Sequence, residues 1–156
     1  WINLNGEWEF HEDYSRSGRE RKLYHVDAAL DSKITVPFCR ESVLSGLGHT
    51  DFCECVWYRK AITLPESWNN GSDRILLHIG ACDYKTEVWV NGKNVGRRLI
   101  PPYSFDVTDA LKSGYNELTV IVSNHNGYEK RDGFSKYLMF EPSGLLGPIT
   151  LKQKNI

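Results

Sequence analysis

Short runs in which apolar and polar residues alternate recur along the whole chain, and this period of two restricts the possible folds more than any other feature. The run at 75–79 places three aliphatic residues on one face, and the run at 118–122 repeats the pattern. Successive side chains of a strand point to opposite faces of a sheet, so such alternation is typical of half-buried strands. Helical periodicity of useful length appears nowhere in the sequence. The pattern therefore predicts an all-β sandwich or barrel.

The clearest local signal is the dipeptide Asn91-Gly92, which directly follows the alternating run at 88–90. Asn-Gly between two apolar runs is the strongest short-range indication of a β-hairpin. We also expect the runs at 75–79 and 88–90 to be neighbouring antiparallel strands. Further strands are expected at 7–10, 33–36, 56–64, 118–122 and 149–151.

The overall charge argues against nucleic acid and membrane partners. The chain carries 19 Lys and Arg against 20 Asp and Glu, and the net charge of -1 gives no long-range attraction to a polyanion. The nearest basic run, 16–22, contains Glu20 and is interpreted as a solvated loop. No apolar stretch approaches the roughly 20 residues that a membrane-spanning helix requires. The length of 156 residues fits one domain, residues 1–156.

The start of the chain suggests a piece of a longer or processed protein. It begins at Trp1 without a methionine or a signal peptide, and its first ten residues already have the pattern of a strand. The compartment stays open. A trimmed export signal would place the protein in the periplasm or outside the cell, and the four cysteines favour neither an oxidising nor a reducing environment.

Metal and cofactor sites are not indicated. His49, Cys53 and Cys55 come nearest to a zinc ligand set, but their spacing differs from that of structural zinc sites. The glycines form neither a Gly-x-Gly-x-x-Gly nor a Walker pattern, so no nucleotide cofactor is expected. No Gly-x-Ser-x-Gly elbow occurs, and no nucleophile is predicted.

An ordered series of segments resembles a known family. The segments are Leu4-Asn5-Gly6-Glu7-Trp8, Val36-Pro37 with Glu41-Ser42, Val56-Trp57-Tyr58-Arg59, Leu64-Pro65, 74–81, Val88-Trp89-Val90-Asn91-Gly92, 105–111, 116–120 and 143–147. In this order and spacing they resemble the N-terminal sugar-binding domain of glycoside hydrolase family 2. The resemblance implies an antiparallel jelly-roll β-sandwich of the galactose-binding-domain type, which is a fragment of a larger multidomain glycosidase.

The same resemblance implies that the chain is not catalytic by itself. In the family, this sandwich precedes an immunoglobulin-like domain and a (β/α)₈ barrel, as in β-galactosidases, β-glucuronidases and β-mannosidases. Glycoside hydrolysis needs two carboxylates that flank the scissile bond, and the resemblance places both in the barrel. We therefore expect no catalytic residue and no turnover by the isolated chain. Its acidic residues are expected to be structural, with Asp83 buried and paired, for example with Arg59.

Contact with carbohydrate is the remaining functional option, because loops of this domain can face the barrel in family 2 enzymes. Asp51, Tyr128, Arg131 and Asp132 are the candidate sugar-facing residues. Planar polar groups bind sugar hydroxyls, and aromatic rings stack on pyranose rings. The loops that carry these residues, 47–53 and 127–140, are therefore the candidate carbohydrate loops, and the second belongs to a stretch without the family's usual motif.

Two interpretations of the carbohydrate loops stay open. In the first, the chain is a scaffold whose loops meet sugar only in the intact enzyme, with the remaining domains as its partners. In the second, it is an autonomous carbohydrate-binding module, and aromatic residues such as Trp68 or Tyr128 are exposed together in one groove.

Overall fold

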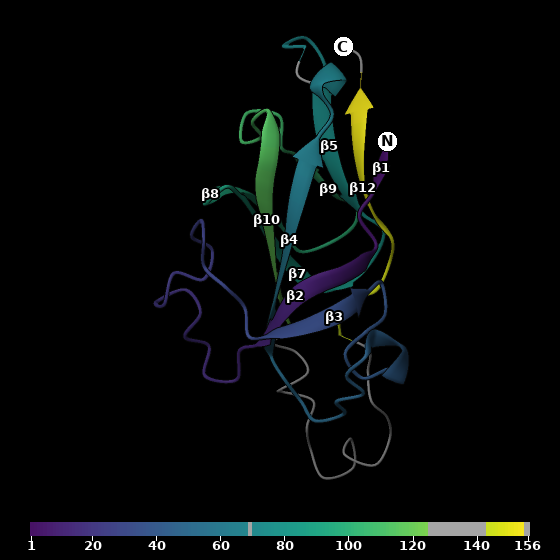
Figure 1. Cartoon of the computed structure of the whole chain (residues 1–156). Coiled ribbons are helices and arrows are strands. Elements are labelled where there is room, and N and C mark those ends of the chain that lie inside the picture. The colour runs from purple at the N-terminus through teal and green to yellow at the C-terminus, as the bar shows by residue number, and fades with distance from the viewer. Residues whose placement is uncertain (69, 125–142, 155–156) are drawn as a thin grey trace.

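Alternating side chains produce strands along most of the chain, and the computed structural model arranges them as a β-sandwich (Figure 1). It describes residues 1–68, 70–124 and 143–154. The strands are β1 (Ile2–Asn3), β2 (Gly6–Glu12), β3 (Ser32–Val36), β4 (Cys55–Leu64), β5 (Arg74–Ile79), β6 (Cys82–Asp83), β7 (Lys85–Val90), β8 (Lys93–Arg98), β9 (Tyr103–Asp106), β10 (Gly114–Ser123), β11 (Gly144–Leu145) and β12 (Ile149–Lys154). Short 3₁₀ helices, η1 (Val43–Ser45) and η2 (Glu66–Trp68), flank β4, and neither is long enough for its periodicity to predict it.

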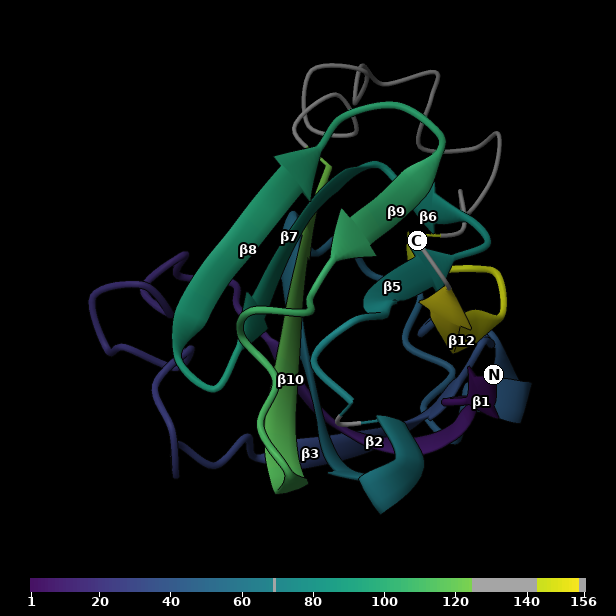
Figure 2. The same ribbon diagram turned by 90° about the horizontal axis from the view of Figure 1, so that it is seen from above.

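The strands form two main antiparallel sheets, which confirms the predicted all-β sandwich. Within the described residues the larger sheet has the order β3-β2-β4-β10-β7-β8, and the smaller has the order β1-β12-β5-β9. Strands β6 and β11 form a separate short ladder. Seen from above, the two main sheets lie on opposite sides of the core (Figure 2).

The hairpin predicted at Asn91-Gly92 is confirmed. Both residues have positive φ, 51° and 78°, as the tight turn between β7 and β8 requires. The prediction that the runs at 75–79 and 88–90 are neighbours is wrong. Strand β5 pairs with β12 and β9, whereas β7 pairs with β10 and β8. The chain changes sheets between β5 and β7, a step that alternation within each strand does not reveal.

The facing sides of the two sheets form the main core. Leu77 on β5 and Val120 on β10 are fully buried, and each such side chain contributes about 1.5–3 kcal/mol by leaving water. Lys60 interrupts the apolar face of β4 without placing a charge in this core. Its ammonium donates to the carbonyl oxygen of Glu7 at 3.0 Å and lies 5.8 Å from the Trp8 ring centroid. The ammonium is thus satisfied by a backbone acceptor and by the face of the Trp8 ring.

The connection from β2 to β3, residues 13–31, crosses the outer face of the larger sheet, and we call it the strap. Tyr24 of the strap stacks on Trp89 of β7, with the ring centroids 4.1 Å apart. Leu30 packs with Ile121 of β10 in a second, smaller apolar cluster. The larger sheet is thus covered on both faces, which explains why every residue from Asn116 to Val122 is buried.

The start of the strap is fixed by Asp13, whose side chain is 2% exposed. Its carboxylate accepts hydrogen bonds from the backbone N–H of Ser17 and Gly18, at 3.0 and 2.9 Å, and from Trp57 Nε1 at 3.1 Å. A Cβ on Gly18 would lie 2.6 Å from the Trp57 ring. The interpretation of 16–22 as a solvated loop is therefore wrong at Gly18, which is buried. Any side chain at this position would keep the strap from packing against the sheet.

Arg59 holds the middle of the strap. Its guanidinium donates to the carbonyl oxygens of Leu23 and His25, at 3.2 and 3.0 Å, and pairs with the Glu117 carboxylate. The predicted partnership of Arg59 with Asp83 is thus wrong. Residues 59 and 117 share the outer face of adjacent strands β4 and β10, and the register places them diagonally opposite one another.

The edges of the sheets are short or charged. Strand β1 has two residues. Strand β8 exposes Lys93, Arg97 and Arg98, and its register with β7 shifts between Val88 and Trp89. A register shift of this kind bends an edge strand and increases its local twist.

Candidate functional site

The loops that carry candidate residues gather at one end of the larger sheet. Strand β2 ends where β4 begins, because Glu12 pairs with Val56, and β10 ends at the same level, because Ser123 pairs with Cys55. We call this the Arg40 end, after the residue at its centre. The segment 37–54 returns to this end before β4 begins.

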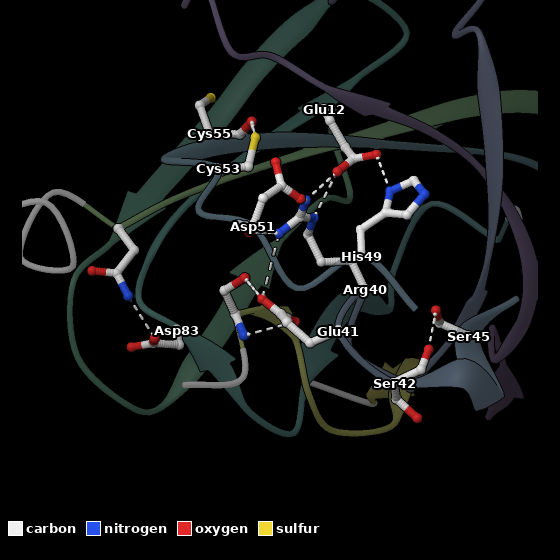
Figure 3. Close-up of polar contacts among 12 residues, drawn as sticks. Glu12, Arg40, Glu41, Ser42, Ser45, His49, Asp51, Cys53, Cys55 and Asp83 are labelled. Atoms are coloured by element: carbon white, nitrogen blue, oxygen red, sulfur yellow. Dashed lines mark hydrogen bonds and ion pairs between the residues drawn. The ribbon is translucent and has the colours of Figure 1, made fainter. Parts of the chain in front are cut away.

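Arg40 is a buried cation between two carboxylates (Figure 3). Its side chain is 1% exposed. The guanidinium donates to Glu12 through both Nε, at 2.8 Å to Oε2, and Nη2. It also donates from Nη2 to Asp51 Oδ1 at 2.7 Å and from Nη1 to the Asp51 carbonyl oxygen at 2.5 Å. These bonds fix the 37–54 segment to the end of β2.

Tyr14 and His49 complete the cluster around Arg40. The Tyr14 hydroxyl donates to Asp51 Oδ2 at 2.6 Å, and His49 Nδ1 lies 2.6 Å from Glu12 Oε1. Partial burial alone would raise the pKa of the Asp51 carboxyl, but the bonds from Tyr14 and Arg40 outweigh it and hold that pKa below its ordinary value. Asp51 is therefore an ionised, oriented acceptor at neutral pH, and its side chain is 57% exposed.

The two carboxylates are not arranged for glycoside hydrolysis. Glu12 and Asp51 contact the same guanidinium nitrogen, so the cation fills the space in which a glycosidic oxygen would have to lie. A catalytic pair also needs one protonated member, whereas the low pKa of Asp51 removes it from that role. In the described part of this end, the two carboxylates bind the guanidinium of Arg40 and are not placed as an acid and base pair for hydrolysis.

A second pair of carboxylates, Asp83 and Glu41, binds the residue that follows β10 and the residue that precedes β11. Asp83 Oδ2 accepts from Asn124 Nδ2 at 2.6 Å, and its backbone pairs with Gly144 in the β6–β11 ladder. Glu41 Oε1 accepts from the Ser143 hydroxyl at 2.6 Å. Asp83 is half-buried and bonds Asn124, so the expectation of a buried Asp83 paired with Arg59 is wrong on both points. We call the pair Asn124 and Ser143 the neck.

Of the predicted sugar-facing residues, the structure describes Asp51 alone, and it lies at the Arg40 end. Tyr128, Arg131 and Asp132 lie outside the described residues. Trp68, proposed as a groove aromatic, is in η2 at the opposite end of β4 and packs against the core. It therefore does not share a groove with Asp51.

His49 and Cys53, two of the three residues that come nearest to a zinc ligand set, form hydrogen bonds within the chain. His49 is joined to Glu12, and the Cys53 thiol donates to the carbonyl oxygen of Cys55 at 3.2 Å. Burial raises the pKa of the Cys53 thiol to about 12, which opposes the thiolate form that zinc requires. The four cysteines are free thiols.

Sequence reasoning did not identify Arg40 and Glu41 as the centre of this site. A cavity in the described residues lies elsewhere, between the sheets, where Ile62, Leu77 and Val90 are among its lining residues. Its lining is mainly apolar, and its two polar members, Asn116 and Glu117, are bonded within the chain, whereas a sugar site needs convergent polar groups that are free to bind. The Arg40 end is consequently the better candidate.

The fold and the Arg40 end together define a class: an all-β sandwich module that gathers its loops at one end and neutralises their charges internally. A family model described as "Glycosyl hydrolase 2 galactose-binding domain-like" matches residues 8–139. The chain belongs to this family, which confirms the resemblance inferred from the sequence.

The relatives and solved structures described next, which are similar to this chain, are all named beta-glucuronidase. "Beta-glucuronidase" of Felis catus is 32% identical over 122 residues, which cover 71% of this chain and 18% of that protein, and the protein of the same name from Rattus norvegicus is 30% identical with the same coverage. The structure of Bifidobacterium dentium beta-glucuronidase complexed with coumarin-3-O-glucuronide has a TM-score of 0.77 at 20% identity, covering 99% of this chain and 30% of that one. Ruminococcus gnavus beta-glucuronidase gives 0.69 at 23% identity, covering 79% and 21%. The chain thus spans about a fifth of the length of the curated relatives it matches.

The helices among the described residues have three residues each, and none of them could span a membrane.

Proposed function

We propose that the chain is the non-catalytic N-terminal β-sandwich domain of a β-glucuronidase-like family 2 glycoside hydrolase, an enzyme that hydrolyses O-glycosyl bonds of β-glycosides. The observation that carries the proposal is the family match over residues 8–139 in a chain that spans about a fifth of its relatives. The names of those relatives favour a β-glucuronidase over a β-galactosidase or a β-mannosidase. Residues 1–156 then form one sandwich domain, and its partners are the remaining domains of the parent enzyme.

The geometry of the Arg40 end supports the non-catalytic role. The guanidinium lies between the carboxylates of Glu12 and Asp51, and each of them is bonded within the chain. Charges neutralised in this way hold the 37–54 segment to the end of β2. We therefore expect the catalytic carboxylates of the proposed enzyme in its other domains, as the family resemblance implies.

We further propose that Asp51 faces carbohydrate in the intact enzyme, together with Tyr128, Arg131 and Asp132 of the segment beyond the neck. Asp51 supports this because its carboxylate is ionised, oriented by Arg40 and Tyr14, and more than half exposed. An oriented carboxylate is a strong acceptor for sugar hydroxyls, since little freedom is lost when the sugar binds.

The experiment compares the isolated chain with the longer protein that contains it. Nitrophenyl β-D-glucuronide, β-D-galactoside and β-D-mannoside are offered to both. We expect no turnover by the chain and preferential hydrolysis of the glucuronide by the longer protein. Saturable hydrolysis by the pure chain would overturn the non-catalytic role, and a longer protein inactive on all three would overturn the proposed enzyme.

Calorimetric titration of the chain with glucuronic acid, galactose and mannose separates a scaffold from an autonomous carbohydrate-binding module. The scaffold role predicts no heat with any sugar at millimolar concentration. Saturable heat that Asp51→Asn or Asp132→Asn abolishes would instead establish independent binding. Asp109→Asn is the matched control, because Asp109 is 84% exposed and lies at the opposite end of the sandwich.

A further inference from the structure

Two residues adjacent in sequence hold two different segments of the Arg40 end. Arg40 binds the 47–53 loop through both the side chain and the carbonyl oxygen of Asp51. Glu41 binds the neck through the hydroxyl of Ser143 at 2.6 Å, and the Ser143 N–H lies 3.4 Å from its second oxygen. Figure 3 shows both sets of contacts side by side. Segments about ninety residues apart in the chain are therefore fixed to a single dipeptide.

The dipeptide also joins these contacts electrostatically. Arg40 Nη1 lies 3.7 Å from Glu41 Oε1, and the two side chains are 1% and 11% exposed. Charges shielded from water interact more strongly than charges at the surface. Loss of the Asp51 carboxylate leaves the guanidinium to Glu12 and Glu41, and so changes the field at the oxygen that receives the Ser143 hydroxyl.

The neck transmits such a change, because its two sides are tied to each other. Asp83 bonds Asn124 through its side chain and Gly144 through its backbone. The Leu145 N–H donates to the Tyr58 hydroxyl at 3.1 Å, and Tyr58 is fully buried in the core. Ser143 is thus joined directly to a segment held by the β6–β11 ladder and by the Tyr58 hydroxyl, so a change at the Glu41–Ser143 bond acts on both sides of the neck.

We infer that Arg40 and Glu41 are positioning residues, which couple the 47–53 loop to the neck so that both present themselves to a β-glycoside as one unit. The inference rests on the proposed function, since it concerns substrate recognition by the intact enzyme. Neither residue contacts the substrate: each acts through the segment that it holds.

The test is a double-mutant cycle of Asp51→Asn and Ser143→Ala in the full-length enzyme, with nitrophenyl β-D-glucuronide as substrate. Each change should raise KM and leave kcat within about twofold, because the reacting carboxylates are elsewhere. Coupled residues depart from additivity, so the double variant should raise KM by less than the product of the single effects, by roughly threefold or more. Purely multiplicative effects would overturn the inference.

The role of the dipeptide itself is tested in the same cycle. In a Glu41→Ala background the coupling between positions 51 and 143 should disappear, and Glu41→Gln, which keeps an acceptor for Ser143 but removes the charge that faces Arg40, should lose most of it. A coupling that survives Glu41→Ala unchanged would show that another route joins the segments. When Asp109→Asn is combined with either single variant, the effects on KM should multiply, because Asp109 is not coupled to either position.

A failure of the proposed function is distinguishable from a failure of this inference. If the full-length protein hydrolyses no glycoside, the same cycle is measured by urea unfolding of the 156-residue chain. Non-additive changes in the free energy of unfolding would then support the coupling even though the proposed enzyme activity had failed. Additive changes would contradict it.

Discussion

Replacement of Arg40 by methionine should destabilise the chain far more than the loss of an exposed arginine. Methionine keeps much of the side-chain volume but leaves Glu12, whose side chain is 12% exposed, without its cation. Breaking a buried ion pair by removing one partner costs about 3–5 kcal/mol. Because Asp51 is 57% exposed and can be rehydrated, we expect the lower value, about 3 kcal/mol. For a chain of this size that lowers Tm by roughly 6 to 12 °C.

The pH dependence of this loss provides the sharper check. The pKa of Asp51 is lowered from its ordinary value of 3.8 in the folded state, so its contribution to stability is present above that value and is lost as pH falls through the folded pKa. The difference between the wild-type chain and Arg40→Met should therefore be full near neutral pH and shrink below about pH 4. Urea unfolding followed by tryptophan fluorescence measures both.

Arg74→Met is the control, because Arg74 is 46% exposed and lies 3.8 Å from each of its carboxylate partners. Its loss should cost less than about 1 kcal/mol. An equally small loss for Arg40→Met at neutral pH, or a large one that does not diminish in acid, would refute the account of the Arg40 end.

Three further outcomes follow from the described contacts. Gly144→Ala should destabilise the chain by about 2–3 kcal/mol in urea unfolding, since Gly144 has φ of 85° and a Cβ would collide with the Tyr58 hydroxyl; Tyr58→Phe in the same chain should restore part of the loss, and no restoration would argue against the collision. Burial raises the pKa of the Cys53 and Cys82 thiols to about 12 and about 11, so iodoacetamide at pH 8 should modify them only after unfolding, as mass spectrometry of the native and urea-treated chain would reveal. Asp13→Ala should release the strap, at a cost of about 2–3 kcal/mol for the buried donors left unpaired, and limited proteolysis that cuts the strap no faster than in the wild-type chain would count against this role.

Much of the fold could be predicted because the local rules agree with the final structure. Alternation identified β5 and β10, and Asn91-Gly92 identified the β7–β8 hairpin, because strands and tight turns depend on residues close in sequence. The partner of β5 could not be identified in this way. It pairs with β12, some seventy residues later, and an alternating strand has the same appearance in either sheet.

The candidate site was predicted less completely. The 47–53 loop was identified and Asp51 does lie at the Arg40 end, while its contact with carbohydrate stays a prediction, as do the roles of Tyr128, Arg131 and Asp132. Arg40 was missed because burial of an arginine is decided by its partners, and Glu12 reaches it only through the register of β2 with β4. The one available signal was its position directly before Glu41, within a segment that carries the family resemblance.

The sheet edges have a consequence for how the chain behaves in concentrated solution. Fibrils grow when an incoming chain pairs with a long, flat row of unsatisfied N–H and C=O groups. Strand β1 offers two residues, and β8 offers a bent edge with Lys93, Arg97 and Arg98 exposed, so an approaching strand meets either too short a template or three positive charges. A sandwich protected in this way can be handled as an isolated chain without seeding cross-β growth at these two edges.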